Sequence, residues 1–294
     1  MGARQPSTHS FKLNLKGKNK MSKPKTYVTL ILDQSGSMGG TKAQAVQGYN
    51  EQVQQMKLNS KDQDIFCSLI TFNGDIFEHL WCEPAEKLTE ATVEDYKTEG
   101  STAMRDALGY AIEKLQKTTD PKEDIAHLVI VISDGAENAS KHYSVEALRE
   151  LKDSVDKTGK WTFTYMLGCD DAYLHKIAQE MNVPISNMAK WSNATPAMAV
   201  RGMKQHTNKT QGYYDNRKAG NVGQANVYSS DSSKLADFTE ESPEDVNDFL
   251  KGLVVPSSPV PPTMPLNVNM NILNDGHTVT CSPFKNYEPV SWTK

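Results

Sequence analysis

The sequence lacks the long apolar segments of membrane and secreted proteins. No run approaches the roughly 18 consecutive apolar residues that a membrane-spanning helix needs. The first residues also lack the apolar core of a secretory signal peptide. We therefore expect no membrane span and no secretion by that route.

Cysteine is scarce, and the net charge is small. The four cysteines show no close metal-type spacing, and three of them lie in apolar segments, as reduced buried thiols do: Cys67, Cys82, Cys169 and Cys281. This usage is typical of a reducing compartment, so we expect the protein to be cytoplasmic. A formal net charge of −4 provides no basic excess for binding phosphate backbones, and we expect no nucleic-acid partner.

A nucleotide-binding P-loop is also missing. That loop has a first glycine, four further residues, and then glycine, lysine and a serine or threonine that binds magnesium. Here Gly36 and residues 37–40 are followed by Thr41, Lys42 and Ala43, so the second glycine and the hydroxyl are both absent. The sequence therefore argues against a site that cradles nucleotide phosphates.

What the sequence does contain is a set of oxygen-bearing side chains after a buried strand. Residues 27–32 are a near-continuous apolar run, which is typical of a strand covered on both faces. Asp33, Ser35 and Ser37 follow at every second position, a spacing that places their side chains on one side of an extended chain. Open α/β sheets bind ligands at the carboxyl ends of such strands. Three hard oxygen donors there predict a site for Mg²⁺ or Mn²⁺.

Two later segments supply further oxygen atoms. Thr102 lies in a loop just before a helical pattern at 104–117, and Asp134 follows a second buried strand at 128–132. Because parallel strands end at the same edge of a sheet, both side chains can reach the pocket that contains Asp33. A helix cap or a turn would explain any one of these residues. It would not explain oxygen donors after two buried strands and in a loop of the same chain.

The segments that carry these residues resemble one family closely. DQSGS at 33–37, GSTAMRDAL at 100–108 and VIVISDG at 129–135 are similar to the metal-ion-dependent adhesion site of von Willebrand factor type A domains. All five positions expected for that site carry the expected residue type, and the resemblance covers roughly residues 25–205.

This resemblance implies a protein-interaction module rather than an enzyme, with no catalytic residue. Ser35, Ser37 and Thr102 would contact Mg²⁺ or Mn²⁺ directly, and Asp33 and Asp134 would do so directly or through water. An Asp or Glu of a partner protein would fill the remaining position. In related domains, changes at the ion move the last helix. Relatives inside cells often act beside AAA+ ATPases or as assembly factors, so the family suggests a AAA+ ATPase or an assembly partner.

Two other functions stay open. Asp33 as a nucleophile and Asp134 as a metal ligand would fit a metal-dependent phosphatase-like hydrolase. Against it, Ser35 stands where such enzymes carry a second carboxylate, and Lys141 is the only nearby lysine to offset phosphate charge. The remaining alternative is a structural component of a particle or complex, in which the metal is incidental.

Alternating strand and helix patterns predict the fold class. We expect an α/β fold with a doubly wound, mostly parallel sheet and helices on both faces. One edge strand should be antiparallel, because Asn73-Gly74 joins two apolar runs as in a hairpin. The expected strands are 27–32, 64–72, 76–82, 128–132, 161–167 and 184–188, and the expected helices are 42–58, 104–117, 144–157, 171–181 and 195–207.

Composition predicts four regions along the chain. We expect a basic, disordered N-terminal arm at 1–25 and the von Willebrand factor type A domain at 26–207. A polar loop with a short helix near 243–252 should occupy 208–253, and a loose Pro-rich tail should occupy 254–294.

Overall fold

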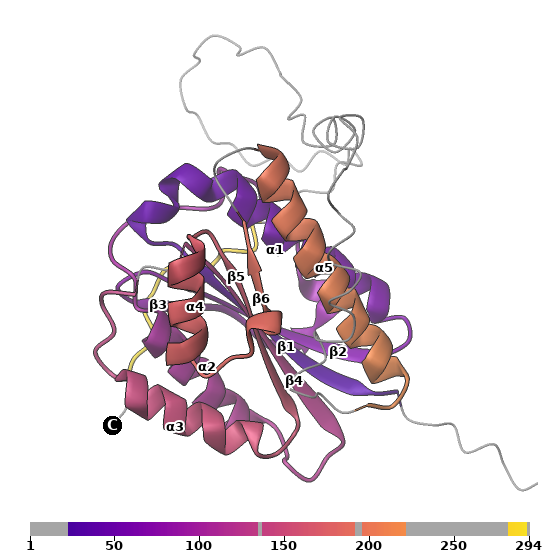
Figure 1. The fold of residues 1–294 in the computed structure, drawn as a ribbon. Coiled ribbons are helices and arrows are strands. Elements are labelled where there is room, and N and C mark those ends of the chain that lie inside the picture. Colours follow the sequence, from indigo (N-terminus) through magenta and orange to yellow (C-terminus); the bar gives the residue numbers. More distant parts are fainter. Residues whose placement is uncertain (1–22, 135–136, 192–195, 222–281, 293–294) are drawn as a thin grey trace, which may run out of the picture.

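A single sheet organises the chain. The computed structural model describes residues 23–134, 137–191, 196–221 and 282–292, and of residues 196–201 it describes the backbone alone. Within these ranges the sheet has six strands in the order β3-β2-β1-β4-β5-β6 (Figure 1). The strands are β1 Lys25–Asp33, β2 Asp64–Phe72, β3 Ile76–Pro84, β4 Ile125–Ser133, β5 Trp161–Leu167 and β6 Met188–Lys190. Only the β2–β3 pair is antiparallel, so the predicted α/β class with one antiparallel edge strand is confirmed.

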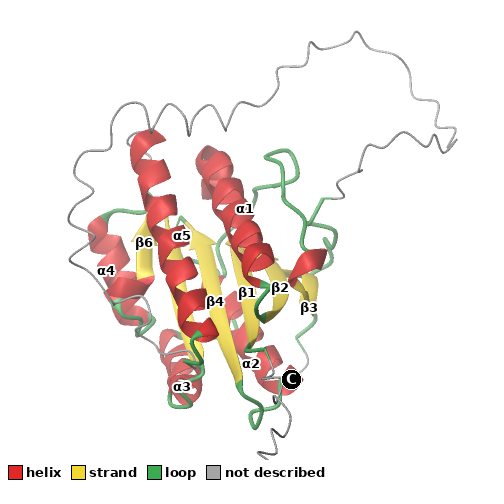
Figure 2. Cartoon of the chain, turned by 90° about the vertical axis from the view of Figure 1, so that its right-hand side faces the viewer, coloured by secondary structure: helices red, strands yellow, loops and turns green. Residues whose placement is uncertain are grey.

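Helices cover both faces of this sheet. The α-helices are α1 Lys42–Asn59, α2 Met104–Thr118, α3 Val145–Asp156, α4 Asp171–Glu180 and α5 Pro196–Lys218, and short 3₁₀ turns occur at Gly36–Thr41, Ala85–Lys87 and Ile185–Asn187. α1 and α5 lie side by side over one face, where their buried residues pack in one apolar core (Figure 2). α2, α3 and α4 pack on the opposite face in a second core. The predicted doubly wound arrangement is therefore present.

The sheet topology places β1 at the point where the strand order reverses. β1 pairs with β2 on one side and with β4 on the other, and both pairs are parallel. Leu32 lies beside Ile132, so Asp33 of β1 and Ser133 of β4 end next to each other at the carboxyl edge. A reversal of this kind opens a crevice between the loops that leave the two strands, which is the usual ligand position in open α/β sheets.

We expected a polar loop from residue 208 onward. This prediction is wrong up to Lys218, because α5 continues to that residue. The prediction failed because polar side chains occupy the buried positions of this half-helix. Thr210, Tyr213 and Arg217 are all at most 1% exposed and recur at helical spacing. A search for periodic apolar residues does not detect a helix whose buried face carries polar side chains. α5 thus crosses the boundary predicted at 207.

The expected short strand at 184–188 is shifted along the chain. Ile185–Asn187 forms a 3₁₀ turn, and only Met188–Lys190 pairs with β5. α5 packs closely on this strand through Gly202, where an added Cβ atom would lie 2.0 Å from the carbonyl oxygen of Lys190. A glycine is required at this contact.

The prediction of a loose C-terminal tail is wrong for residues 282–292. We call this segment the C-terminal strap. Phe284 is buried in the core beneath α1, whereas Val290 and Trp292 pack against the core beneath α2. Between them, the backbone N–H of Val290 donates to the carbonyl of Ile76 at 2.8 Å. The strap therefore wraps around the edge strand β3 and partly covers it, which reduces the exposure of an unpaired strand edge.

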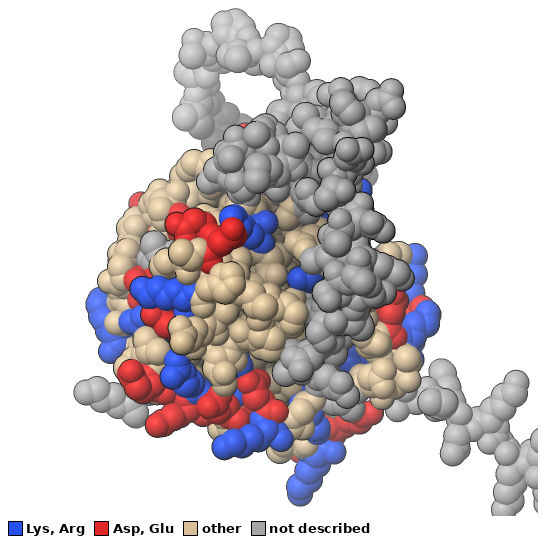
Figure 3. All heavy atoms as spheres, in the orientation of Figure 1, with Lys and Arg blue, Asp and Glu red and all other residues tan. Residues whose placement is uncertain are grey.

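Several predictions lie outside the described residues. They concern most of the N-terminal arm, the region 222–281 with its expected helix near 243–252 and most of the Pro-rich tail, and Cys281. None of the described helices is both long and apolar enough to cross a membrane. On the face shown in Figure 3, acidic and basic side chains are interspersed.

Candidate metal centre

Asp33 is the buried centre of the cluster at the carboxyl edge. Its Oδ1 accepts a hydrogen bond from the backbone N–H of Ser35 at 2.8 Å, and its Oδ2 accepts one from the hydroxyl of Ser133 at 2.5 Å. The side chain is fully buried. Burial raises the pKa of Asp33 to about 6, the hydrogen bonds from Ser133 and Ser35 oppose this shift, and the charge of Asp134 adds to it. Two carboxylates therefore lie close enough to repel each other.

Asp134 directly follows β4 and is half-buried. Its Oδ1 atom is buried and has no hydrogen-bond partner among the described residues. Buried polar atoms are nearly always partnered, and a charged one is costly to leave alone. The carboxylate of Asp134 is therefore available to a group from outside the chain.

Ser35 and Ser37 lie together beside Asp33. Their hydroxyl oxygens are 3.1 Å apart, which is hydrogen-bond distance. Ser35 is buried, whereas Ser37 is exposed at the start of the 3₁₀ turn Gly36–Thr41. The alternating pattern predicted from the sequence thus places these two hydroxyls at one location, with one of them open to solvent.

Thr102 is buried in the loop that precedes α2. Its backbone N–H donates to Oδ1 of Asn138 at 2.9 Å, and its carbonyl accepts from the N–H groups of Asn138 and Ala139. Two residues earlier, the carbonyl of Gly100 accepts a hydrogen bond from the N–H of Gly36 at 3.0 Å. The loop is therefore fastened to both neighbouring loops. In the described residues no hydrogen bond joins the Thr102 side chain to the other four predicted ligands.

Two carboxylates hold the loop after β4 in place. Asp106 accepts hydrogen bonds from the backbone N–H groups of Lys141, His142 and Tyr143. Glu137 accepts from the N–H groups of Arg105, Ala139 and Ser140 and from the Ser140 hydroxyl. α2 thus fixes the loop that begins next to Asp134.

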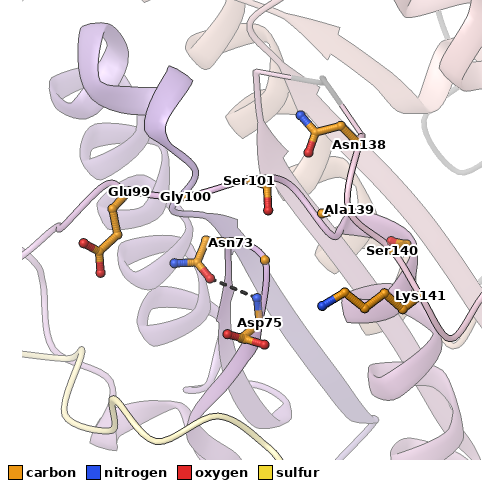
Figure 4. Close-up of a pocket in the computed structure, with 10 residues that line it drawn as sticks. Asn73, Asp75, Glu99, Gly100, Ser101, Asn138, Ala139, Ser140 and Lys141 are labelled. Carbon is orange, nitrogen blue, oxygen red and sulfur yellow. Dashed lines mark hydrogen bonds between the residues drawn. The ribbon is translucent and has the colours of Figure 1, made fainter.

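An open hollow of about 840 Å³ lies between these loops (Figure 4). Three segments line it: the β2–β3 turn at 73–75, the loop at 99–101, and residues 138–141. The side chain of Lys141 points into the hollow from one side, toward Asp75 on the other (Figure 4). The hairpin turn predicted at Asn73-Gly74 is present, and the N–H of Asp75 donates to Oδ1 of Asn73 at 3.0 Å.

The sequence interpretation did not identify several residues of this region. Ser133 and Asp106 lie inside the quoted motifs, but their roles as partners of Asp33 and of the loop amides carry no signal in a single sequence. Tyr96 is fully buried with an unpartnered hydroxyl, and burial together with the charges of Asp33 and Asp134 raises its pKa well above the usual value. It lies in an irregular segment, where no periodicity indicates a buried position.

The donor set fits a hard divalent cation. Two carboxylates and the neighbouring hydroxyls are oxygen donors, which Mg²⁺ and Mn²⁺ prefer, and the unpartnered Oδ1 of Asp134 provides a free acceptor beside them. No group of three or more His, Cys, Asp or Glu side chains gathers at a potential metal site in the described part of the chain. The donor set thus relies on hydroxyls more than on a cluster of acids.

Comparisons with known proteins identify one matching family and several similar solved structures. The profile of the von Willebrand factor type A domain matches residues 28–199. Similar solved structures include a von Willebrand factor type A protein from Catenulispora acidiphila, at 17% identity and a TM-score of 0.44, covering 64% of this chain and 43% of that one. Proximal thread matrix protein 1 from the mussel byssus is 13% identical with a TM-score of 0.43, covering 64% and 47%. Manganese-loaded TRAP protein from Plasmodium vivax is 17% identical with a TM-score of 0.43, covering 61% and 73%.

The chain thus spans less than half the length of the first two of these structures. No curated protein matches its sequence. The profile match covers more than half of the 294 residues and includes nearly the whole sheet and helices α1 to α4. The chain belongs to the von Willebrand factor type A domain family.

Proposed function

We propose that this chain is a divalent-metal-dependent protein-interaction module that captures a carboxylate of a partner protein. Asp33, Ser35, Ser37, Thr102 and Asp134 would hold Mg²⁺ or Mn²⁺, and an Asp or Glu of the partner would complete the site. The single observation that supports this most is the buried, unpartnered Oδ1 of Asp134 beside the buried carboxylate of Asp33.

The chain's own residues prepare the site in three ways. Ser133 and the N–H of Ser35 fix both oxygens of Asp33, so this carboxylate has a set orientation. Ser35 and Ser37 offer neutral oxygens, which leave positive charge uncompensated. The exposed position of Ser37 leaves the cluster open to an approaching group. A bound divalent ion would supply the positive charge that attracts a partner's carboxylate.

The first test is calorimetric titration of Mg²⁺ into the full chain, followed by Mn²⁺. We expect one ion per chain and a loss of affinity of about 100-fold or more in Asp134→Asn, because the substitution removes a full charge while keeping the shape. The matched control is Asp64→Asn, an exposed carboxylate at the opposite edge of the sheet. Equal affinities of the unaltered chain and Asp134→Asn would contradict the proposed site.

The second test concerns the partner. The immobilised chain is presented to extract of its native source with Mg²⁺ and again with a chelator, and Asp134→Asn is run in parallel. We expect a partner that is retained only by the unaltered chain and only with Mg²⁺. A partner retained equally in all arms would favour a structural component in which the metal is incidental. A AAA+ ATPase or an assembly factor among the metal-dependent partners would give the interaction a cellular role.

We also propose that the site does not catalyse hydrolysis. Lys141, the only nearby lysine that could offset phosphate charge, is exposed to solvent where it borders the hollow. Incubation of the Mg²⁺-loaded chain with p-nitrophenyl phosphate should give no release of product above the level seen with Asp134→Asn. Turnover that depends on Asp33 and Mg²⁺ would replace the binding function with a phosphatase-like one.

A further inference from the structure

Tyr96 presents a buried hydroxyl that nothing in the described structure satisfies. The residue lies in the segment between the 3₁₀ turn Ala85–Lys87 and α2, and its side chain is 0% exposed. Its Oη atom has no hydrogen-bond partner among the described residues. A buried tyrosine hydroxyl normally finds a partner. Its presence in a core therefore requires an explanation, since phenylalanine would pack there without that penalty.

The backbone around Tyr96 ties it to the metal-site loops. The N–H of Glu99 donates to the carbonyl of Gln34 at 2.8 Å, and the carbonyl of Gly100 accepts from Gly36 at 3.0 Å. Three residues after Tyr96, the chain is thus bonded to the loop that carries Asp33, Ser35 and Ser37. Gly100 has a φ of +76°, a conformation that favours glycine and allows this close approach.

The pKa of Tyr96 also relates this residue to the proposed metal site. Burial raises the pKa of Tyr96 well above its usual value, and the negative charges of Asp33 and Asp134 raise it further. A tyrosine is protonated at neutral pH in any case, and the two contributions relate Tyr96 to the charges of both carboxylates. A protonated phenol is a hydrogen-bond donor, which is the complement of a carboxylate oxygen.

The C-terminal strap holds the ring of Tyr96 in position. The ring of Phe284 lies 5.9 Å from that of Tyr96 and 5.7 Å from that of Tyr49, measured between centroids. Phe284 therefore packs against two buried tyrosines. Their hydroxyls differ: the hydroxyl of Tyr49 donates to the carbonyl of Thr89 at 2.8 Å, whereas that of Tyr96 donates to nothing described.

We infer that Tyr96 is a positioning residue of the proposed metal site, whose hydroxyl donates a hydrogen bond to a carboxylate oxygen of Asp33 or Asp134 when the site is loaded. This inference rests on the proposed function. It adds to the site a sixth side chain, six residues before Thr102 in the segment that precedes α2. The unpartnered hydroxyl is then a group held ready for the loaded state.

The test compares Tyr96→Phe with Tyr49→Phe in two measurements: urea unfolding without metal, and calorimetric titration of Mg²⁺. Without metal, Tyr96→Phe should be as stable as the unaltered chain or more so, because it removes a buried hydroxyl that lacks a partner. Its affinity for Mg²⁺ should fall about fivefold, the usual worth of one hydrogen bond. Tyr49→Phe should show the opposite pattern, with a less stable chain and an unchanged affinity, because it loses the bond to Thr89.

Each outcome supports or contradicts the role proposed for Tyr96. If the unaltered chain binds Mg²⁺ and Tyr96→Phe binds it equally well, Tyr96 is not part of the site, and the proposed function stands without it. If Tyr96→Phe loses metal-free stability as Tyr49→Phe does, its role is structural and the inference fails. If the unaltered chain binds no Mg²⁺, the proposed function fails first and takes this inference with it.

Discussion

Two groups of buried polar side chains differ in whether the chain itself supplies their hydrogen-bond partners. Beneath α5, both ring nitrogens of His206 lie within hydrogen-bond distance of Gln52 and Thr164. The guanidinium of Arg217 donates to the carbonyls of Lys25 and Asn221 and to the hydroxyl of Thr26. At the carboxyl edge of the sheet, by contrast, Asp134 and Tyr96 have buried oxygens without partners.

We interpret this difference as a structural use of buried polarity beneath α5 and a functional use at the carboxyl edge. The chain itself satisfies His206 and Arg217, although Oε1 of Gln52, which contacts His206, has no partner among the described residues. Polar groups left unsatisfied in one location lower stability, and such a cost is typical of binding sites. The contrast predicts that variants beneath α5 change stability alone, whereas variants at the carboxyl edge change metal binding.

The largest expected effect is a loss of stability in acid, which tests the buried histidines. Burial, together with a smaller effect of Lys209 on His206 and of Lys160 on His127, lowers the pKa of both histidines to about 3, and burial lowers the pKa of His79 to about 4. Unfolded histidine has a pKa near ~6.5. The unfolded state therefore takes up protons first as the pH falls, so stability is retained above about pH 6.5 and lost toward the folded pKa values.

Each histidine contributes a slope of about 1.4 kcal/mol per pH unit in this window. Urea unfolding should thus show a loss of several kcal/mol between pH 7 and pH 5. His206→Gln should reduce the slope by about one proton, because glutamine is polar but does not titrate there. An identical slope in His206→Gln would mean that His206 is not held neutral.

The next effect concerns Arg217, which is 1% exposed. Arg217→Met keeps much of the volume but leaves the carbonyls of Lys25 and Asn221 without their donor, and we expect a loss of about 3 kcal/mol in the free energy of unfolding. The matched control is Arg149→Met, because Arg149 donates to carbonyls at an exposed position and should cost less than about 1 kcal/mol. The affinity for Mg²⁺ should be unchanged in both. If Arg217→Met changed the affinity for Mg²⁺, the buried polar residues beneath α5 could not be distinguished from those of the proposed metal site.

A comparable effect is expected in the C-terminal strap. Phe284→Ala removes the ring that packs between Tyr49 and Tyr96, and should cost about 3 kcal/mol in urea unfolding. Tyr287→Ala is the control, since Tyr287 is 49% exposed and contacts Lys97 through a cation–π interaction that contributes little at the surface. Limited proteolysis should release the strap of Phe284→Ala sooner. Equal stability of both variants would show that the strap is not anchored by Phe284.

The smallest effect is expected at Ser37, which is exposed and contacts Ser35. Ser37→Ala should lower the affinity for Mg²⁺ about fivefold while the stability of the metal-free chain stays within about 0.5 kcal/mol. Ser154→Ala, an exposed serine in α3, should change neither quantity. Unchanged affinity in Ser37→Ala would remove this hydroxyl from the proposed ligand set.

The sequence was sufficient to predict the parts of the fold that follow periodic patterns. The apolar runs of β1 and β4 and the Asn73-Gly74 turn predict the sheet, and the structure confirms them. The second half of α5 was missed because its buried face carries polar residues such as Arg217, whose burial depends on partners in another element. The strap was missed because isolated aromatic residues such as Phe284 have no pattern.

The residues of the candidate site likewise divide into those that the sequence predicts and those that it does not. Asp33, Ser35, Ser37 and Asp134 could be proposed from strand ends and spacing alone, and the structure places Ser37 in contact with Ser35 and Asp134 near Asp33. Whether all five side chains ligate one ion stays a prediction. Tyr96 could not be found, since its relation to Asp33 arises only when its segment bonds to Gln34 across the fold.

The most direct test of the central claim is the free energy of unfolding of the full chain in urea, with and without Mg²⁺, for the unaltered chain and Asp134→Asn. An ion that binds only the folded state at about 100 times its Kd adds about 2.7 kcal/mol. We predict a gain of this size in the unaltered chain and a gain below about 0.5 kcal/mol in Asp134→Asn. No gain in the unaltered chain, or an equal gain in both, would contradict the claim that the oxygens at the carboxyl edge are kept for an external cation.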